Sequence, residues 1–142
     1  MATVMYQFGL SQTFPNGVID EVKDLPNNPT DDIIESEIIK GRRDLRDLLT
    51  ITIDGEEAKD LDDAISIEPC ENNCYRLYVH IADVANFIEP FSPLLNEAAK
   101  RATSVYLPGI TARMLPDILS TDVCSLNPNA DRDAISVVME LD

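Results

Sequence analysis

The sequence predicts an α+β fold, in which a mostly antiparallel sheet is flanked by helices. Apolar residues recur at helical spacing before residue 41 and again over residues 94–102, whereas three segments, 49–53, 75–81 and 134–141, alternate with the two-residue period of strands. A content of 44% hydrophobic and 26% charged residues is typical of a globular chain. A length of 142 residues suits one domain.

Residues 1–47 are predicted to form a helical, acidic lead-in segment. A short amphipathic helix covers residues 18–25 and ends before Pro26. A second helix covers residues 31–40, because Thr30 fits its N-cap and two aspartates follow in the first turn. Its isoleucines are spaced for one buried stripe, made of Ile33, Ile34, Ile38 and Ile39.

A strand and a hairpin are predicted next. Leucine and isoleucines alternate with threonines over residues 49–53, and strands over residues 64–67 and 75–81 flank a turn at residues 71–73. His80 lies opposite the apolar positions of its strand, so we expect a surface or interface role for it rather than catalysis. The hairpin is expected to bury the face that carries Tyr75, Leu77, Val79 and Ile81.

The last third of the chain is predicted to hold one helix and two strands. Ser92 followed by proline marks the start of a helix over residues 93–103. A short strand over residues 104–107 leads into a loop that reaches Arg132, and residues 134–141 form a final strand. Because the chain stops on that strand, which would leave an unpaired edge, we expect it to be a piece of a larger protein.

The net charge of −15 excludes a simple basic surface for gripping RNA. The one basic cluster is Arg42, Arg43 and Arg46, which either approaches RNA phosphate or pairs with neighbouring acids such as Asp44. The start of the chain lacks the pattern of a signal peptide, and no run of 18 apolar residues could cross a membrane.

The cysteine content predicts a reduced protein. Three cysteines are an odd number, and a chain of this length needs no disulfide framework for stability. We therefore expect a cytoplasmic protein with no disulfide-linked partner, and we expect Cys124 to be a buried structural thiol.

The densest chemical feature is the acidic loop, residues 54–64, which holds four aspartates and two glutamates against one lysine. A loop between two buried strands can turn such carboxylates toward one point, where their repulsion calls for a compensating cation. Mg²⁺ prefers oxygen ligands and serves phosphoryl transfer, so the loop predicts phosphate-ester chemistry. A solvated acidic surface is the commoner meaning of such a run, and this alternative stays open. The aspartates are Asp54, Asp60, Asp62 and Asp63.

Several motifs together resemble the opening of the catalytic domain of the RNB family, which comprises ribonuclease II and ribonuclease R, with the ribonuclease R branch the closer likeness. The matches keep the order and spacing of the family. They are Gly41 to Asp47, Thr52 to Gly55 with Asp60 to Ala64, His80 to Val84, Ser104 to Pro108, Met114 to Pro116, and Cys124 to Pro128.

The resemblance implies a Mg²⁺-dependent, processive exoribonuclease that hydrolyses single-stranded RNA from the 3′ end to nucleoside 5′-monophosphates. It implies that all four aspartates are catalytic and help to hold metal. By this resemblance Asp54 and Asp63 are magnesium ligands, and Asp62 is indispensable to the chemical step. Asp60 helps to hold the metal and the nucleotide. Tyr106 matches the aromatic residue that stacks on a base at the 3′ end. Without the resemblance, a tyrosine in a short apolar strand is expected to pack in the core.

The resemblance also divides the chain, with residues 48–142 as the N-terminal part of the RNB catalytic domain, truncated at its C-terminus. The later half of that domain is missing, so we expect the fragment alone to bind RNA weakly and to cleave it negligibly. Two alternatives remain: a non-catalytic acidic module that binds a basic protein or a divalent ion, and a different metal-dependent phosphohydrolase.

Overall fold

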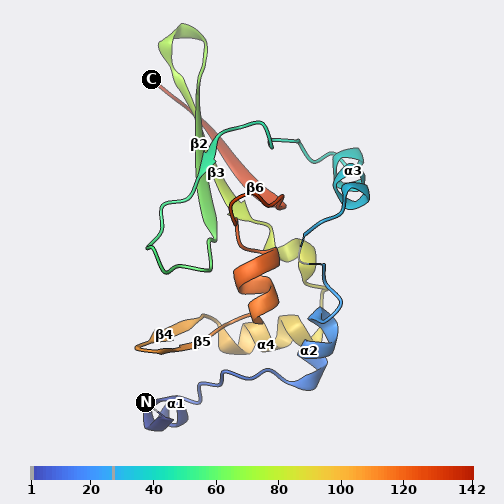
Figure 1. Ribbon diagram of the computed structural model, residues 1–142, viewed down its shortest axis with the longest axis vertical. Coiled ribbons are helices and arrows are strands. Elements are labelled where there is room, and N and C mark those ends of the chain that lie inside the picture. Colours follow the sequence, from blue (N-terminus) through green and yellow to red (C-terminus); the bar gives the residue numbers. More distant parts are fainter. Residues whose placement is uncertain (1, 27) are drawn as a thin grey trace.

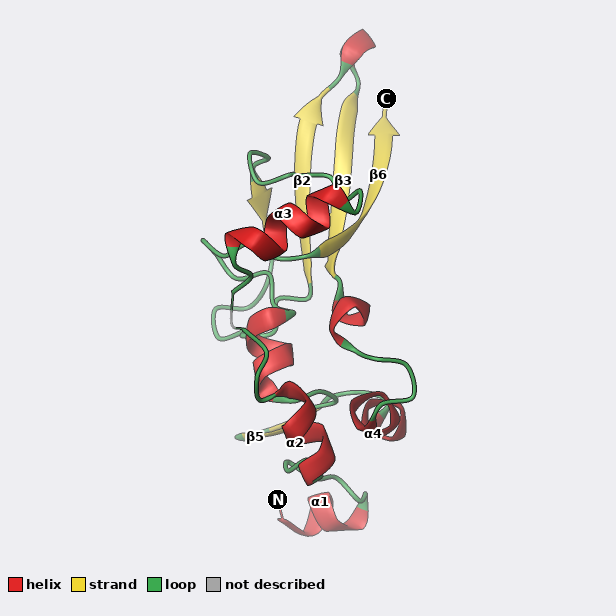
Figure 2. Cartoon of the chain, turned by 90° about the vertical axis from the view of Figure 1, so that its right-hand side faces the viewer, coloured by secondary structure: helices red, strands yellow, loops and turns green. Residues whose placement is uncertain are grey.

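The structure, a computed structural model, describes residues 2–26 and 28–142. An antiparallel sheet occupies one end of an elongated molecule, and helices gather at its other end and along one side (Figures 1 and 2), as the α+β class predicts. The helices are α1 (Ala2–Gln7), α2 (Asn16–Val22), α3 (Asp31–Ile39) and α4 (Pro93–Arg101). The strands are β1 (Thr50–Ile51), β2 (Asp63–Pro69), β3 (Tyr75–Ala82), β4 (Val105–Leu107), β5 (Ile110–Ala112) and β6 (Ala134–Leu141).

The main sheet has the order β1-β2-β3-β6, and every neighbouring pair is antiparallel. The predicted hairpin is confirmed as β2 and β3, and the final predicted strand is confirmed as β6, which pairs with β3 along its whole length. The predicted strand over residues 49–53 is shortened to β1, because only Thr50 and Ile51 pair with β2.

The predicted loop up to Arg132 contains two elements that the sequence did not reveal. β5 pairs with β4 across a turn in which Gly109 adopts a positive φ of 74°, a conformation that suits glycine. Residues Ile118–Val123 form a π-helix, drawn in orange in Figure 1. β5 has three residues, too few for a periodic signal, and a π-helix lacks the 3.6-residue period, so sequence patterns missed both.

The buried face of the hairpin is the opposite of the predicted one. Tyr78, His80 and Ala82 are buried, whereas Tyr75 and Ile81 are exposed. The physical reason is that this chain covers only one side of the sheet, over which α3 lies (Figure 2). α3 and the segment at residues 42–50 line a hollow of about 890 Å³ together with Tyr78 and His80.

His80 is buried within a polar ladder that crosses all strands of the main sheet, so the expected surface position is wrong. Its Nε2 lies 3.0 Å from the Ser66 hydroxyl, and its Nδ1 lies 2.7 Å from the Ser136 hydroxyl. The Thr50 hydroxyl, 2.8 Å from that of Ser66, extends the ladder to β1. The imidazole therefore links β2 to β6.

Two helices begin where the sequence predicts, but α3 does not pack as predicted. α4 begins as predicted, because the Ser92 side chain accepts a hydrogen bond of 3.1 Å from the backbone N–H of Leu95. α3 follows Thr30 as predicted but buries no residue, so the expected isoleucine stripe is wrong. Ile39, for example, is 85% exposed. The hollow between α3 and the sheet separates the stripe from a packing partner.

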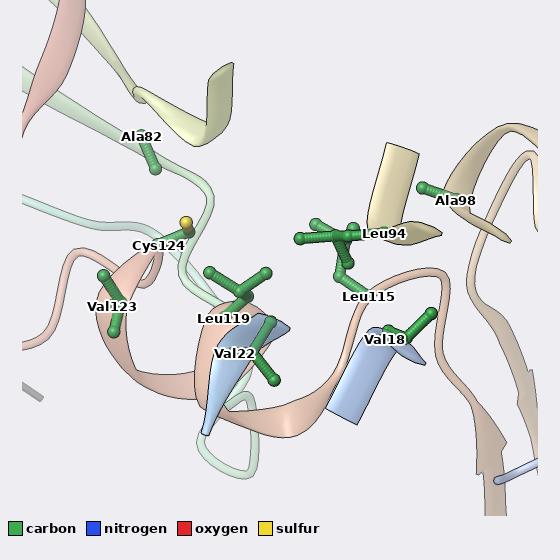
Figure 3. Packing of buried hydrophobic residues seen from close by; sticks show 9 residues of the cluster. All are labelled: Val18, Val22, Ala82, Leu94, Ala98, Leu115, Leu119, Val123 and Cys124. Carbon is green, nitrogen blue, oxygen red and sulfur yellow. The ribbon is translucent and has the colours of Figure 1, made fainter. Parts of the chain in front are cut away.

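The main core lies among α2, α4 and the π-helix, below the end of β3 (Figure 3). α2, α4 and the π-helix each contribute to it, and so do the end of β3 and residues near it in space. The core therefore fixes the π-helix and the chain after it against the end of β3, beside the acidic loop. Its buried residues are Val18, Val22, Ala82, Leu94, Ala98, Leu115, Leu119, Val123 and Cys124.

The cysteines only partly follow the prediction of a reduced protein. Cys70 and Cys74 form a disulfide across the turn between β2 and β3, where the turn brings their Cα atoms within 5.3 Å. Cys124 is a buried free thiol, as predicted, and burial raises its pKa to about 12. None of the helices in the described ranges is long and apolar enough to cross a membrane.

Candidate active site

The acidic loop connects β1 to β2 beside the sheet and faces the β4–β5 hairpin (Figure 1). Asp63 is the first residue of β2, and the backbone carbonyl of Asp62 accepts a 3.0 Å hydrogen bond from the N–H of Ala82. Asp54 follows β1 after two residues. The end of the sheet thus holds Asp62 and Asp63, whereas Asp54 and Asp60 lie on the connecting chain.

A buried serine anchors the loop from the segment that follows the π-helix. The Ser125 hydroxyl accepts a 3.0 Å hydrogen bond from the N–H of Leu61 and lies 3.1 Å from the carbonyl of Lys59. The N–H of Leu126 donates to the carbonyl of Leu61 at 2.8 Å. These contacts fix the backbone on both sides of Asp60, and the sequence analysis did not foresee a role for Ser125.

Two side chains from the hairpin region meet Asp60. The Tyr106 hydroxyl donates to its carboxylate, and Nη1 of Arg113 lies 3.2 Å from the same oxygen. Burial raises the pKa of Asp60, but the hydrogen bond from Tyr106, backbone hydrogen bonds and the charge of Arg113 outweigh it, so the pKa lies below its usual value. Asp60 is therefore held as an anion.

The other three predicted aspartates have no such partners. Across the described ranges, no side-chain hydrogen bond or ion pair reaches Asp54, Asp62 or Asp63, and all three are exposed. Partial burial of its carboxyl, followed by the charges of Asp60, Asp63 and Asp54, raises the pKa of Asp62 by more than the charge of Arg113 lowers it. Asp62 therefore senses the charges of the other three aspartates, and Asp54, Asp62 and Asp63 have no hydrogen-bonded or ion-paired partner of their own within the described residues.

These carboxylates fit a hard divalent cation in their chemistry, since their oxygens are the ligands that Mg²⁺ prefers and their mutual repulsion is what a cation would relieve. Within residues 2–26 and 28–142, however, no three His, Cys, Asp or Glu side chains converge closely enough to form a ready-made metal cluster. The carboxylates that could bind the ion are present, but they do not converge on one point in this structure.

Tyr106 presents its ring to solvent. The residue is 61% exposed, so the alternative that it packs in the core is wrong. Its hydrogen bond to Asp60, followed by partial burial, raises the pKa of its hydroxyl, which keeps the proton in place as the donor. A tethered hydroxyl and a free ring face suit a side chain that stacks on a flat ligand.

Arg42 and Arg46 of the basic cluster form ion pairs, as one of the two alternatives predicted. Arg46 pairs with Asp44 at 2.7 Å, and Arg42 contacts Glu37 at 2.8 Å and also Asp83. Both arginines line the 890 Å³ hollow, to which none of the four aspartates contributes. The acidic loop and the hollow are therefore separate features.

Arg113 and Ser125 are the two residues at the site that sequence patterns missed. Arg113 lies in a stretch without periodicity, and a lone buried serine carries no signal of its own. Each reaches the loop through the fold, from 53 and 64 residues away along the chain.

Together, the fold and the site define a segment of an α+β domain that holds a carboxylate loop beside an exposed aromatic residue. The RNB domain model matches residues 42–142. The chain is 46% identical to ribonuclease R of Chlamydia pneumoniae over 96% of its length, and 54% identical to DIS3-like exonuclease 2 of Schizosaccharomyces pombe over 80% of its length. The chain belongs to the RNB domain family.

Structural comparison agrees. Mycoplasma genitalium RNase R, solved in complex with ribose-methylated single-stranded RNA, superimposes with a TM-score of 0.87 at 32% identity over 99% of this chain. The chain spans 19% of the chlamydial relative, 12% of the fission-yeast relative and 21% of the mycoplasma chain. The family is thus established from a segment that spans between about one eighth and one fifth of these relatives.

Proposed function

We propose that this chain is part of the catalytic domain of a Mg²⁺-dependent, processive 3′-to-5′ exoribonuclease. The substrate is single-stranded RNA, the products are nucleoside 5′-monophosphates, and the cytoplasm is the compartment. The observation that carries the proposal is the loop with three unpaired carboxylates, Asp54, Asp62 and Asp63, to which the exposed Tyr106 is tied through Asp60. The RNA-bound state of the mycoplasma relative supports the substrate class.

The four aspartates divide into three roles. Asp54 and Asp63 would hold the metal, and Asp62, whose pKa is raised by burial and by the neighbouring aspartates, would serve the chemical step. Asp60, already held by Tyr106 and Arg113, would link these ligands to the nucleotide. When bound, Mg²⁺ supplies charge neutralisation at the phosphate and an activated water.

Tyr106 would hold the 3′-terminal base by stacking, which is worth about 1–3 kcal/mol per base. The net charge of −15 opposes RNA binding by the matched segment alone. We therefore expect the groove for the RNA backbone and the remaining catalytic groups to lie outside these 142 residues, and the isolated segment to be inactive.

The test uses 5′-labelled single-stranded RNA, Mg²⁺ and the complete gene product that carries these residues. Stepwise shortening from the 3′ end with release of mononucleotides is expected, together with loss of activity in Asp62→Asn. Asp31→Asn, an exposed aspartate in the first turn of α3, is the matched control and should stay active.

Two outcomes would overturn the proposal. An inert wild type, or an Asp62→Asn variant with full activity, would identify the acidic loop as a non-catalytic interaction or ion-binding module. Cleavage that releases products other than mononucleotides would identify a different phosphohydrolase.

A further inference from the structure

Arg113 bridges the acidic loop and the π-helical region. Its Nη1 lies 3.2 Å from Asp60 Oδ2, and its Nε lies 2.8 Å from Asp117 Oδ1. Its own backbone carbonyl accepts a 2.9 Å hydrogen bond from Nη1 of Arg101, so the start of the side chain is fixed as well. The side chains of Arg113 and Asp60 are 17% and 18% exposed, so their attraction is shielded from solvent more than that of most ion pairs in this chain.

Arg113 supplies the sole lysine or arginine group within 4.0 Å of any of the four loop aspartates in the part of the chain that the structure describes. Asp60 contacts it from the loop and Asp117 from the start of the π-helix, and its charge also acts on Asp62 by lowering the pKa of that carboxyl against the opposing effect of the other aspartates. One positive charge therefore offsets part of a strongly negative neighbourhood.

The same contact reaches Tyr106. β4 and β5 pair Tyr106 with Thr111, two residues before Arg113, and both Tyr106 and Arg113 bind the same oxygen of Asp60. Asp60 is thus the point where the hairpin is tied to the loop by two donors. The Tyr106 ring, 61% exposed, projects from this junction.

We propose that Arg113 is a positioning residue that orients the site for RNA binding and lowers the affinity of the acidic loop for a divalent cation. By binding Asp60 it holds the hairpin, and with it the ring of Tyr106, against the loop. Its charge also weakens the attraction of the loop for a divalent cation. The inference rests on the proposed function. It assigns to that site a residue that favours the binding of RNA and disfavours the binding of a divalent cation.

The opposite signs follow from elementary physics. Removal of a positive charge from beside the carboxylates strengthens their attraction for a divalent cation, by roughly three- to tenfold at these separations near a protein surface. Removal of the same side chain frees Asp60 and Tyr106, so the base loses a pre-oriented partner and the KM for RNA rises. If the residue merely stabilised the fold, its removal would weaken the binding of the cation and of RNA together.

The experiment measures two ligands separately in the complete gene product. Binding of Mn²⁺ alone, followed by titration calorimetry or electron paramagnetic resonance, reports the cation site without any reaction. Steady-state KM and kcat on a single-stranded oligoribonucleotide report the RNA side. The variants are Arg113→Met, Arg113→Lys, Lys40→Met as a charge-matched control at the end of α3, and the wild type.

Arg113→Met is expected to bind Mn²⁺ roughly three- to tenfold more tightly and to raise the KM for RNA, with a smaller change in kcat. Arg113→Lys keeps the charge but lacks the planar fork that spans two carboxylates, so it should keep the wild-type Mn²⁺ affinity and raise KM by an intermediate factor. Lys40→Met should match the wild type in both.

Weaker Mn²⁺ binding in Arg113→Met, or unchanged Mn²⁺ binding together with unchanged KM, overturns the role of Arg113 while the nuclease function stands. An inactive wild type overturns the nuclease function instead, and the Mn²⁺ comparison still tests the charge effect. If Arg113→Met does not fold, Arg113→Lys decides: a wild-type KM in that variant overturns the positioning role.

Discussion

Substitution of Ser125 by alanine should loosen the acidic loop. The Ser125 hydroxyl is fully buried and accepts a hydrogen bond from the N–H of Leu61 at 3.0 Å, next to Asp60. It also lies 3.1 Å from the carbonyl of Lys59 and 3.2 Å from Asn127 Oδ1, and its single proton serves one of them at a time. The substitution removes these contacts and gives the N–H of Leu61 no replacement acceptor.

The magnitude follows from these contacts. A part-buried donor left without a partner costs about 1–3 kcal/mol, so Ser125→Ala should lower the free energy of unfolding by about 2 kcal/mol. For a chain of 142 residues, this corresponds to a fall in Tm of roughly 6–8 °C. The amide of Leu61 should exchange its hydrogen about 30-fold faster if that cost falls on local opening of the loop.

Thermal melting followed by circular dichroism measures the first effect, and hydrogen exchange followed by NMR measures the second. Ser36→Ala on α3 is the matched control, since Ser36 is only partly buried and its substitution should change the free energy of unfolding by less than about 0.5 kcal/mol. The reasoning is refuted if Ser125→Ala has the same Tm as Ser36→Ala and the hydrogen exchange of the Leu61 amide does not change.

Three further predictions concern single side chains. Burial lowers the pKa of His80 in the folded chain below 6.5. The contribution of the neutral imidazole to stability is therefore present above pH 6.5 and is lost as the pH falls through the lowered pKa of the folded state. Tm measured from pH 7.5 to 5 should fall less steeply in His80→Gln than in the wild type. Cys124, with a pKa of about 12, should resist iodoacetamide at pH 8 in the folded chain and react after unfolding, and mass spectrometry that finds it modified in the folded state would contradict its burial. Tyr106→Ala should leave Tm nearly unchanged, because the residue is 61% exposed. In the complete gene product it should weaken binding of a 3′-terminal nucleotide by roughly 5- to 150-fold, measured by fluorescence anisotropy; equal binding would refute the stacking role.

Local patterns predicted most elements of this chain correctly. The helix after Ser92, the β2–β3 hairpin and the strand β6 all follow from capping residues, turn residues and period-two alternation, which act between near neighbours. The same patterns failed for β5, which depends on pairing with β4, and for the π-helix, which depends on packing of Leu119 and Val123 into the core.

Alternation also predicted two distinct faces for the sheet but not which one is buried. The aliphatic face, with Ile81 and Ile135, is the more exposed, and the face of Tyr78 and His80 is covered. The choice depends on where α3 and the segment at residues 42–50 lie, and no strand sequence encodes the position of its cover.

The sequence by itself determined the acidic loop, its four aspartates and the aromatic residue at position 106, because these are fixed by residue type and spacing. Only the tertiary structure decided that Tyr106 and Arg113 bind Asp60, that Ser125 holds the backbone beside it, and that Asp54, Asp62 and Asp63 have no paired partner within the described residues. The physical reason is that charge compensation and hydrogen bonding act over a few ångströms in space, and the core brings together segments that are more than 40 residues apart in the chain.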